Sequence, residues 1–282
     1  MRCLLTGPTG QVGWEVASRL AALGEVVALD RTALDLADGD AIRARVRELH
    51  PDVIVNAAAY TAVDRAESEP DRANAINATA PGVLAEEAKS LGALLVHYST
   101  DYVFDGTKVA PYTEEDAPNP LSVYGHTKLA GERAIQASGC RHLILRTSWV
   151  YASRGHNFLL TMLKLGGERP ELRVVDDQRG APTWARDIAA ATVTLLAKPP
   201  NGLFHLTAAG ETTWHGLACE IMRLAGRTPV VHRTRTAEYP TAARRPANSV
   251  LDNVRVRAAG IVMPGWEQSL AKCLAEVRQA QA

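Results

Sequence analysis

The sequence lacks the features that membrane, nucleic-acid-binding and secreted proteins require. Its 31 basic and 31 acidic residues cancel, so no overall charge attracts it to nucleic acid or to an anionic membrane. No stretch approaches the roughly 20 apolar residues of a membrane span. The residues around Cys3–Leu5 also lack the successive charged, apolar and small-residue segments of a signal peptide. We expect a cytoplasmic protein that binds neither nucleic acid nor membrane.

Cysteine is also scarce. The four residues Cys3, Cys140, Cys219 and Cys273 are too widely spaced for the paired motifs of zinc sites or redox centres. This usage is typical of reduced thiols in a cytoplasm. Apolar residues, in contrast, are abundant, because 46% of the 282 residues are hydrophobic and can form a full core. Since no linker, repeat or low-complexity tract interrupts the chain, we expect lobes that share one folding unit.

Short apolar runs rich in Val, Ile and Leu alternate with helical patterns over the first half of the chain. The runs predict strands buried on both faces, at Cys3–Thr6, Val26–Asp30, Val53–Ala57, Leu94–Ser99 and Leu143–Ser148. The patterns between them predict crossover helices, at Gln11–Leu23, Ala41–Leu49, Asp71–Leu91 and Tyr124–Ala137. This alternation indicates an α/β fold with a doubly wound parallel sheet.

A glycine-rich turn follows the first predicted strand and opens the first predicted helix, with the sequence Gly7-Pro8-Thr9-Gly10-Gln11-Val12-Gly13. Phosphate binding at such a turn needs backbone N–H groups at a helix N-terminus and no obstructing side chain, and glycine meets both needs. The spacing is G-x-x-G-x-x-G rather than G-x-G-x-x-G, which matches the variant of the short-chain dehydrogenases. It predicts a Rossmann-type domain that binds NADH or NADPH through Gly7, Gly10, Gln11, Val12 and Gly13. A turn kept only for packing is the alternative.

Two neighbouring side chains after the second predicted strand favour opposite cofactors. Asp30 follows the glycine turn at close to the ~20-residue spacing at which a carboxylate bonds the adenosine ribose hydroxyls. This spacing favours NADH. Arg31 could pair with the 2′-phosphate of NADPH instead. The pair leaves the choice open, and an ordinary solvated turn is the alternative. Asp35 and Leu36 are expected to cover the adenine side of the same cofactor. The small side chains of Ala57, Ala58 and Ala59 would let the chain approach it closely, and an alanine-rich core segment is the alternative.

Tyr124 and Lys128 stand four positions apart in a predicted helix, so their side chains share a face. A phenol with an ordinary pKa of about 10 needs its anion stabilised before it can exchange protons near neutrality, and a nearby ammonium does that. Ser99-Thr100-Asp101 ends a predicted strand, and open parallel sheets bind ligands at the carboxyl ends of their strands. Thr100, Tyr124 and Lys128 are therefore the expected catalytic set. A surface Tyr-Lys pair is the alternative.

Several segments together resemble the family of dTDP-4-dehydrorhamnose reductases, and the match runs essentially end to end. The segments are Gly7–Gly13, Asn56–Asp64, Ser99–Phe104, Tyr124–Lys128, Arg146–Tyr151, Asn157-Phe158, Asp177-Gln178, Gly180–Thr183, Arg245-Pro246 and Asn248-Ser249. The Tyr-Lys pair is shared by all short-chain dehydrogenases, whereas Asn56–Asp64 and Thr100–Phe104 are closer to this one family. The resemblance implies NADH- or NADPH-dependent reduction of dTDP-4-dehydro-6-deoxy-L-mannose at C4 to dTDP-L-rhamnose, the last step in making this sugar donor for cell-surface polysaccharide.

The resemblance also implies roles at matching positions. Tyr124 would donate a proton to the carbonyl oxygen, Lys128 would hold the nicotinamide ribose and lower the pKa of the tyrosine, and Thr100 would bond the oxygen. The side chains that orient the sugar would be Asp101, Trp149, Thr61 and Val63. The cofactor would be lined by Gly10, Gln11, Val12, Asp30, Ala59 and Tyr60, with Ser99 beside them. Pyrophosphate would be clamped by Arg245, Arg244 and Asn248, unless these form a solvated basic loop.

The expected division has a dinucleotide-binding domain of residues 1–148 with about 184–205. Residues of about 149–183 and 206–282 would form a smaller α/β substrate-binding lobe intertwined with it. Two alternatives remain: another nucleotide-sugar ketoreductase or epimerase on the same scaffold, and a catalytically silent, NADP-binding regulatory subunit. The complete set Thr100, Tyr124 and Lys128 weighs against silence.

For some members, the resemblance implies a dimer bridged by a divalent ion that glutamates hold. Glu15 and Glu276 are the matching candidates in this sequence. Arg186 falls where a further acid would be wanted, and a cation has little use for an arginine ligand. We therefore predict no bound metal and a metal-bridged dimer that is weak or absent, with monomer and homodimer both open.

Overall fold

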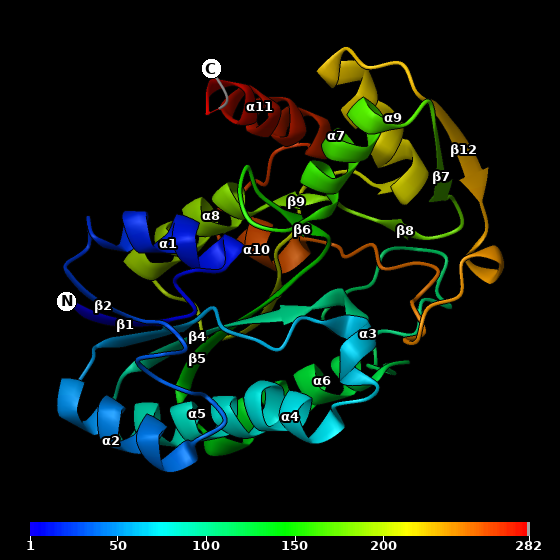
Figure 1. The fold of residues 1–282 in the computed structure, drawn as a ribbon. Coiled ribbons are helices and arrows are strands. Elements are labelled where there is room, and N and C mark those ends of the chain that lie inside the picture. Colours follow the sequence, from blue (N-terminus) through cyan, green and yellow to red (C-terminus); the bar gives the residue numbers. More distant parts are fainter. Residues whose placement is uncertain (281–282) are drawn as a thin grey trace.

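The computed structural model describes residues 1–280 and is built around a six-stranded parallel sheet (Figure 1). The strands lie in the order β10-β5-β4-β3-β1-β2. Their bounds are β1 Arg2–Thr6, β2 Glu25–Leu29, β3 Val53–Asn56, β4 Leu94–Thr100, β5 Arg141–Thr147 and β10 Gly202–His205. Because β1 pairs with β2 on one side and β3 on the other, the connections diverge there and leave a crevice at the strand carboxyl ends. The predicted doubly wound parallel sheet is confirmed.

Helices cover both faces of the sheet (Figure 1). One face packs against α1 (Gln11–Leu20), α8 (Ala185–Ala197) and α10 (Val254–Ala258), through a cluster that includes Val16, Leu20, Ile188, Leu195 and Val256. The other packs against α2 (Gly39–Leu49), α5 (Ala80–Leu91) and α6 (Val123–Ser138), through a cluster that includes Ile42, Val46, Leu84 and Ile135. Successive strand residues alternate between these clusters, which explains why the strands read as continuous apolar runs.

The helices begin where side chains satisfy free backbone N–H groups. Asp38 accepts a hydrogen bond from the Ala41 amide at 3.0 Å and starts α2 two residues before the predicted position. Ser122 accepts from the Gly125 amide at 3.2 Å and starts α6. Gly92 and Gly139 end α5 and α6 in the left-handed conformation. The short strand β10 was not predicted, because four residues carry too little pattern.

The helix predicted over Asp71–Leu91 is divided into α4 (Pro70–Asn74), a π-helical turn (Ala75–Thr79) and α5. The π turn contains Asn77, whose buried amide accepts from the Tyr60 N–H at 2.8 Å. The same amide donates to the Tyr60 carbonyl at 3.1 Å and to the Thr127 hydroxyl at 3.2 Å. Such turns are common at functional sites, and this one fixes the loop after β3 against α6.

A smaller lobe lies beside the carboxyl edge of the sheet, at the upper right in Figure 1. Its core lies among α7 (Phe158–Glu168), α9 (Trp214–Ala225) and α11 (Trp266–Gln279). Its paired strands are β7 (Glu171–Val175) with β12 (Val230–Thr234), β6 (Val150–Tyr151) with β9 (Thr183–Trp184), and β8 (Arg179–Gly180) with β11 (Thr212–Thr213). The remaining short helices are α3 (Val63–Ala66) and 3₁₀ turns at Asp101–Val103 and Thr236–Glu238.

The division of the chain into a dinucleotide-binding domain and a substrate-binding lobe stays a prediction, which can be compared with the hydrophobic packing. Residues of α8 and β10 lie in clusters of the sheet, as the division requires. Val256, Ile261 and Met263 also join the sheet cluster, although they fall within the segment proposed for the lobe. Residues 281–282 of that segment lie outside the described part of the chain. Within residues 1–280, no helix has the length and apolar character needed to cross a bilayer.

Candidate active site

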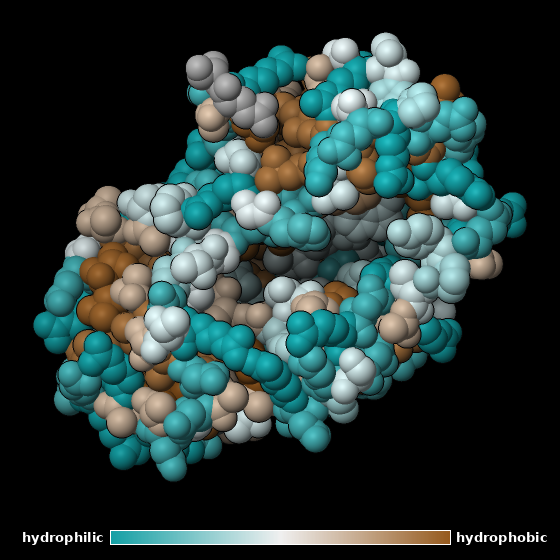
Figure 2. Space-filling model, viewed as in Figure 1, coloured by the Kyte–Doolittle hydropathy of each residue, from teal (hydrophilic) through white to brown (hydrophobic). Residues whose placement is uncertain are grey.

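A cavity of about 640 Å³ opens at the carboxyl ends of the sheet strands. Figure 2 shows the hollow between the sheet and the smaller lobe. Its walls come from the glycine turn, the ends of β2, β3 and β4, the start of α6 and the loop after β6. This is the crevice in which open α/β sheets bind ligands.

The glycine turn is shaped by close backbone contacts. Gly7 has a φ of +70°, and a Cβ added there would lie 2.8 Å from Ala58 backbone atoms. A Cβ on Gly13 would lie 2.0 Å from the Gly7 carbonyl oxygen, so Gly13 serves the turn's packing and does not line the cavity. Gly10 is the N-cap of α1 and brings no side chain to its first N–H groups. The N-terminus of α1 therefore faces the cavity and suits an anionic ligand.

The cavity brings together most of the residues predicted for the cofactor. They are Gly7, Gly10, Gln11, Val12, Asp30, Arg31, Asp35, Leu36, Ala57, Ala58, Ala59, Tyr60, Ser99, Tyr124 and Lys128. Of the predicted substrate residues, Thr61 and Tyr124 line it, whereas five others lie outside its walls, namely Val63, Thr100, Asp101, Trp149 and Arg245. The sugar site predicted for these residues would thus adjoin the cavity rather than fill it.

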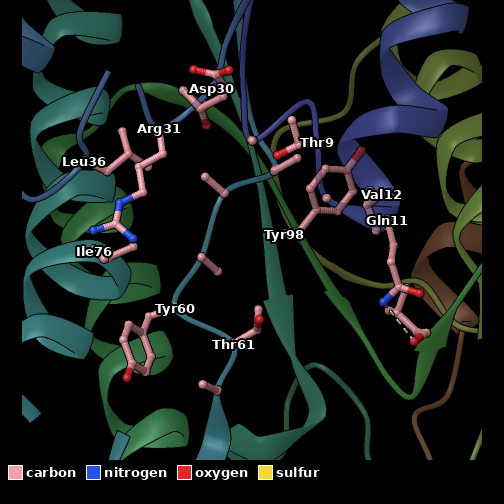
Figure 3. Close-up of a pocket in the computed structure, with 18 of the residues that line it drawn as sticks. Thr9, Gln11, Val12, Asp30, Arg31, Leu36, Tyr60, Thr61, Ile76 and Tyr98 are labelled. Carbon is pink, nitrogen blue, oxygen red and sulfur yellow. Dashed lines mark hydrogen bonds between the residues drawn. The ribbon is translucent and has the colours of Figure 1, made fainter. Parts of the chain in front are cut away.

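Asp30 and Arg31 differ in how freely they can meet a ligand. One oxygen of Asp30 accepts bonds from the Thr32 N–H at 2.9 Å, the Thr32 hydroxyl at 2.7 Å and the Ala33 N–H at 3.0 Å. These bonds lower the pKa of Asp30 and occupy that oxygen with the turn. Arg31 instead extends along the cavity wall between Leu36 and Ile76 (Figure 3). The structure thus leaves the Arg31 guanidinium in the cavity, beside the position predicted for the adenosine.

Tyr124 and Lys128 occupy the first turns of α6, as predicted. The Lys128 nitrogen is fully buried, donates to the Tyr98 carbonyl at 2.6 Å and lies 3.0 Å from His97 Nε2. Burial lowers the pKa of Lys128 to about 8. Burial raises the pKa of Tyr124 to about 12, and the neighbouring Thr100 side chain opposes that rise in part. Tyr124 is therefore protonated at neutral pH, the state that a proton donor needs.

The side chains of Thr100 and Asp101 are hydrogen-bonded to each other at the carboxyl end of β4. The Thr100 hydroxyl donates to Asp101 Oδ1 at 2.9 Å and accepts from the Tyr102 N–H at 3.1 Å. The other Asp101 oxygen is buried and has no hydrogen-bond partner within residues 1–280. The neighbouring Ser249 side chain also lowers the pKa of Asp101, so a ligand hydroxyl would meet this oxygen beside Ser249. Thr100 can donate to a ligand when its hydroxyl turns away or when a protonated Asp101 donates to it.

The buried Asp101 carboxyl predicts an unusual pH dependence of stability. Burial raises its pKa to about 6, so the folded state binds this proton more tightly than the unfolded chain. The associated stabilisation is complete below about pH 4 and is lost as the pH rises through about 6. Asp101→Asn should therefore raise the free energy of unfolding at pH 7.5 by at most about 3 kcal/mol. Urea unfolding at pH 4.5 and 7.5 measures this.

Asp105 provides a matched control of opposite sign. Hydrogen bonds from the Thr107 N–H, Asn119 and Tyr112 hold the pKa of this nearby carboxyl well below its usual range. Its ionised form therefore stabilises the fold above the unfolded pKa, and the effect is lost on acidification. Asp105→Asn should destabilise the protein at pH 7.5. Equal losses for both variants would contradict the interpretation of Asp101.

Trp149 is held in an uncommon conformation by a second tryptophan. Its φ is +47°, in the left-handed region that large side chains rarely adopt. Its ring stacks on Trp214 with centroids 3.6 Å apart and planes 6° apart, and a Cβ on Gly180 would lie 2.4 Å from its indole. Trp214 is held in turn by donating to Gln178 at 3.2 Å. Trp214 and Gly180 thus orient the residue predicted to meet the sugar.

Arg245 is engaged within the protein. Its guanidinium donates to Asp64 at 2.8 and 3.2 Å and to the Ala243 carbonyl at 3.1 Å. Asp64 also accepts from the Ala243 N–H at 3.0 Å. The pair of Asp64 and Arg245 therefore joins α3 to the loop that leads to Asn248, which forms an isolated β-bridge with Arg179. The amide of Asn248 donates to the Lys108 carbonyl at 2.7 Å. Their contribution to pyrophosphate binding stays a prediction.

Sequence reasoning missed part of the cavity wall. The additional lining residues include Thr6, Thr9, Arg65, Arg72, Ile76, Tyr98, Arg154 and His156. Arg154 stacks on the exposed Trp14 ring, 3.4 Å from its centroid. Tyr98 was detectable, because it adjoins Ser99 in the quoted motif. Thr6 and Thr9 were detectable as well, because Thr9 lies within the glycine-rich turn and Thr6 directly before it. The remaining residues depend on contacts between distant segments and left no local pattern.

A buried ion pair supports the end of β4. Arg146 donates to both oxygens of Glu132, at 2.8 and 2.6 Å, and Ser99 donates to the same carboxylate. The two charged side chains are 4% and 2% exposed. Ser99, which was predicted to contact the cofactor, lines the cavity, but its hydroxyl donates to Glu132.

The glutamates suggested for a bridging metal are paired by an arginine. Arg186 donates to Glu15 at 3.1 Å and also to Glu276. Glu15 accepts in addition from Arg19 at 3.2 Å. With these carboxylates neutralised, adding Mg²⁺ or EDTA should leave the molecular mass in solution unchanged, as measured by light scattering. A mass doubling that requires Mg²⁺ and is abolished by Glu15→Gln would contradict this.

The chain is similar over its length to known proteins. The family model described as RmlD substrate binding domain matches residues 1–279. The dTDP-4-dehydrorhamnose reductase of Burkholderia thailandensis is 47% identical, over 98% of this chain and 99% of that protein. The protein of the same name from Escherichia coli K12 is 45% identical, over 98% of both chains.

Solved structures agree with this. A dTDP-4-dehydrorhamnose reductase from Clostridium acetobutylicum superposes with a TM-score of 0.96 at 40% identity, over 99% of this chain and 100% of that one. The Bacillus anthracis reductase, solved in complex with NADP, gives 0.95 at 35% identity over 98% and 99%. A Thermus thermophilus UDP-glucose 4-epimerase shares the fold, with a TM-score of 0.84 at 23% identity over 99% and 100%.

Proposed function

The chain belongs to the family of dTDP-4-dehydrorhamnose reductases, and we propose that it reduces dTDP-4-dehydro-6-deoxy-L-mannose at C4 to dTDP-L-rhamnose with NADPH or NADH. The observation that carries the proposal is the convergence of the glycine turn, Tyr124 and Lys128 on one cavity. Tyr124 stands at the edge nearest Thr100 and Asp101, where a ligand would meet both a proton donor and a free carboxylate oxygen.

The residues present fit a nicotinamide dinucleotide. The open N-terminus of α1 suits the pyrophosphate, and the small side chains of Ala57 and Ala58 let a ligand lie close to the chain. Arg31 favours a 2′-phosphate at the adenosine end, whereas the free oxygen of Asp30 favours ribose hydroxyls. Both cofactors therefore stay in the proposal. When bound, the dinucleotide would supply the hydride.

Each catalytic residue has a separate task in this proposal. Tyr124 gives its phenolic proton to the sugar oxygen, and its high pKa ensures that the proton is present at neutral pH. Thr100 donates to the same oxygen as negative charge develops on it. Lys128 holds a ribose hydroxyl and stabilises the phenolate that Tyr124 becomes. The proton is then restored to Tyr124 from solvent.

The sugar nucleotide is assigned to the space between the cavity and the smaller lobe. Asp101 would accept from a sugar hydroxyl through its free oxygen, and Trp149 would cover a face of the ring. Thr61, which lines the cavity, and Val63, at the start of α3, would meet the sugar from the side of β3. Arg245 would contribute to the pyrophosphate. We place the enzyme in the cytoplasm, as a monomer or a homodimer without a bridging metal.

The decisive experiment supplies the purified protein with dTDP-4-dehydro-L-rhamnose and either NADPH or NADH. Loss of nicotinamide absorbance in proportion to substrate, with dTDP-L-rhamnose identified by NMR, is the expected result. Comparison of the two cofactors determines the preference. An epimerase would retain its cofactor through turnover, and a silent regulatory subunit would bind cofactor without consuming it, so either outcome would overturn the proposal.

A further inference from the structure

A chain of buried polar side chains runs beneath the cavity from the glycine turn to the catalytic lysine. The Thr6 hydroxyl, in the last residue of β1, donates to Asn56 Oδ1 at 2.7 Å. The Asn56 amide nitrogen lies 3.1 Å from His97 Nδ1, and His97 Nε2 lies 3.0 Å from the Lys128 nitrogen. Thr6, Asn56, His97 and Lys128 are each only 1% exposed.

The proposed chemistry assigns no task to His97, yet its position is costly. A buried imidazole is retained without penalty only when both nitrogens have partners. Here the two partners are Asn56 and Lys128, on β3 and α6 respectively. Burial and the neighbouring Lys128 lower the pKa of His97 well below its ordinary value, so the ring stays neutral.

A neutral ring beside a lysine permits two arrangements of the hydrogen bonds between Asn56, His97 and Lys128. If Lys128 is an ammonium, it has no acceptor capacity, so Nε2 must accept and the ring proton sits on Nδ1 facing the Asn56 oxygen. If the Asn56 nitrogen donates to Nδ1, the ring proton sits on Nε2 and Lys128 must accept as a neutral amine. The two arrangements differ by one proton and by a half-turn of the Asn56 amide. The structure shows the amide with its nitrogen toward His97 and its oxygen accepting from the Thr6 hydroxyl and the Ala58 N–H, so the half-turn would cost those two bonds.

We propose that His97, oriented by Asn56, is a positioning residue that holds the Lys128 nitrogen and sets whether it is charged. The inference rests on the proposed reductase function for its catalytic meaning, since Lys128 charge stabilises the Tyr124 phenolate. The row of hydrogen-bonded side chains starts at Thr6, next to Gly7, so it also connects Lys128 to the glycine turn that lines the cavity.

Other ionisable groups surround this lysine and set the background for its titration. Glu132 on α6 raises the pKa of Lys128, but its own charge is balanced by Arg146 of β5. Among the elements that pack against α6, β4 contributes Tyr98 and the 3₁₀ turn contributes Asp101 and Tyr102. Arg65 of α3 and Arg72 of α4 line the same cavity as Lys128 and add positive charge to its surroundings. None replaces the acceptor that His97 supplies, because Glu132 is already bonded to Arg146 and Ser99.

The direct test follows the lysine nitrogens of the ligand-free protein by NMR as the pH is raised. The chain has six lysines, and the Lys128 signal is assigned by its loss in Lys128→Met. His97→Leu removes the acceptor of the ammonium, so the pKa of Lys128 should fall below its wild-type value. His97→Gln places an amide oxygen near the position of the lost Nε2 atom, so it should reverse much of the decrease in the pKa of Lys128. His142→Leu, at the opposite end of neighbouring β5, is the matched control and should change nothing.

A second measurement follows the ring nitrogens of His97 in the wild-type protein as the pH is raised. Ring nitrogen shifts of His97 should report a neutral imidazole throughout, whose tautomer changes in the same pH interval as the charge of Lys128. An imidazole that charges on its own, or a Lys128 titration identical in wild type and folded His97→Leu, would overturn the proposal.

Steady-state kinetics supplies the catalytic arm. In His97→Leu, kcat at neutral pH should fall at least about tenfold, as when a hydrogen bond to a charged group is lost, with a smaller change in the sugar KM. The kcat profile should also move toward acid pH, where Lys128 regains its proton. Because the NMR arm requires no substrate, failure of the reductase assay alone would refute the proposed function and leave the His97 inference to the NMR result.

Discussion

Tyr124→Phe is expected to reduce turnover by about 10²- to 10⁴-fold, because it removes the proton donor while keeping the ring. The phenol is the acidic group that the structure places between the cavity and Thr100, and burial keeps it protonated. Cofactor binding should survive, since the glycine turn and Lys128 are untouched. Stopped-flow reduction of the sugar and fluorescence titration with NADPH measure the two properties separately.

Tyr102→Phe is the matched control for that experiment. Its ring meets the Tyr124 ring edge-on, with centroids 5.6 Å apart, so the variant removes a neighbouring phenol from the same aromatic pair. Turnover within about tenfold of wild type is expected, because a neighbouring phenol supplies no proton to the sugar. Equal activity of Tyr124→Phe and wild type would refute the assignment of the proton donor.

Glu132→Gln is expected to destabilise the fold by about 3–5 kcal/mol, the usual cost of leaving one member of a buried ion pair unpaired. Arg146 is almost fully buried, and its third guanidinium nitrogen already has no hydrogen-bond partner within residues 1–280. Loss of the carboxylate would leave that cation with neutral partners only. Urea unfolding at neutral pH, monitored by tryptophan fluorescence, measures the change.

Two comparisons isolate the buried charge as the cause. The double variant Glu132→Leu with Arg146→Met removes both charges and should recover most of the lost stability. Glu220→Gln breaks a pair whose arginine, Arg223, is 68% exposed, and should cost less than about 1 kcal/mol. A double variant as unstable as Glu132→Gln would show that packing, rather than charge, dominates at this position.

The sequence predicted the parts of the molecule whose signals are local. The glycine turn, the strand β4 and the Tyr124–Lys128 spacing each lie within one short segment, so pattern alone located them. The helix limits differ mainly where capping decides them, as at Asp38. The sheet was predictable because strands buried on both faces form continuous apolar runs.

The undetected features depend on contacts between segments far apart in the chain. Trp214, the first residue of α9, stacks on Trp149 of the loop between β5 and β6, and Asn77 reaches Tyr60 from a π turn. His97 is a polar residue in an otherwise apolar strand, and nothing near it in the sequence indicates a role. Its role can be inferred only from its contacts with Asn56 and Lys128. The two-residue strands of the smaller lobe are too short to show any periodicity.

The order of the strands has a consequence for how the chain folds. β5 ends at Thr147, but its partner β10 begins only at Gly202, after the chain has built α7, β7 and α8. Until β10 arrives, the β5 edge presents unpaired backbone groups, a template for intermolecular pairing. Conditions that slow closure of this edge, such as dilute denaturant, should therefore promote aggregation during refolding, and a chain released before residue 202 should be captured by chaperones.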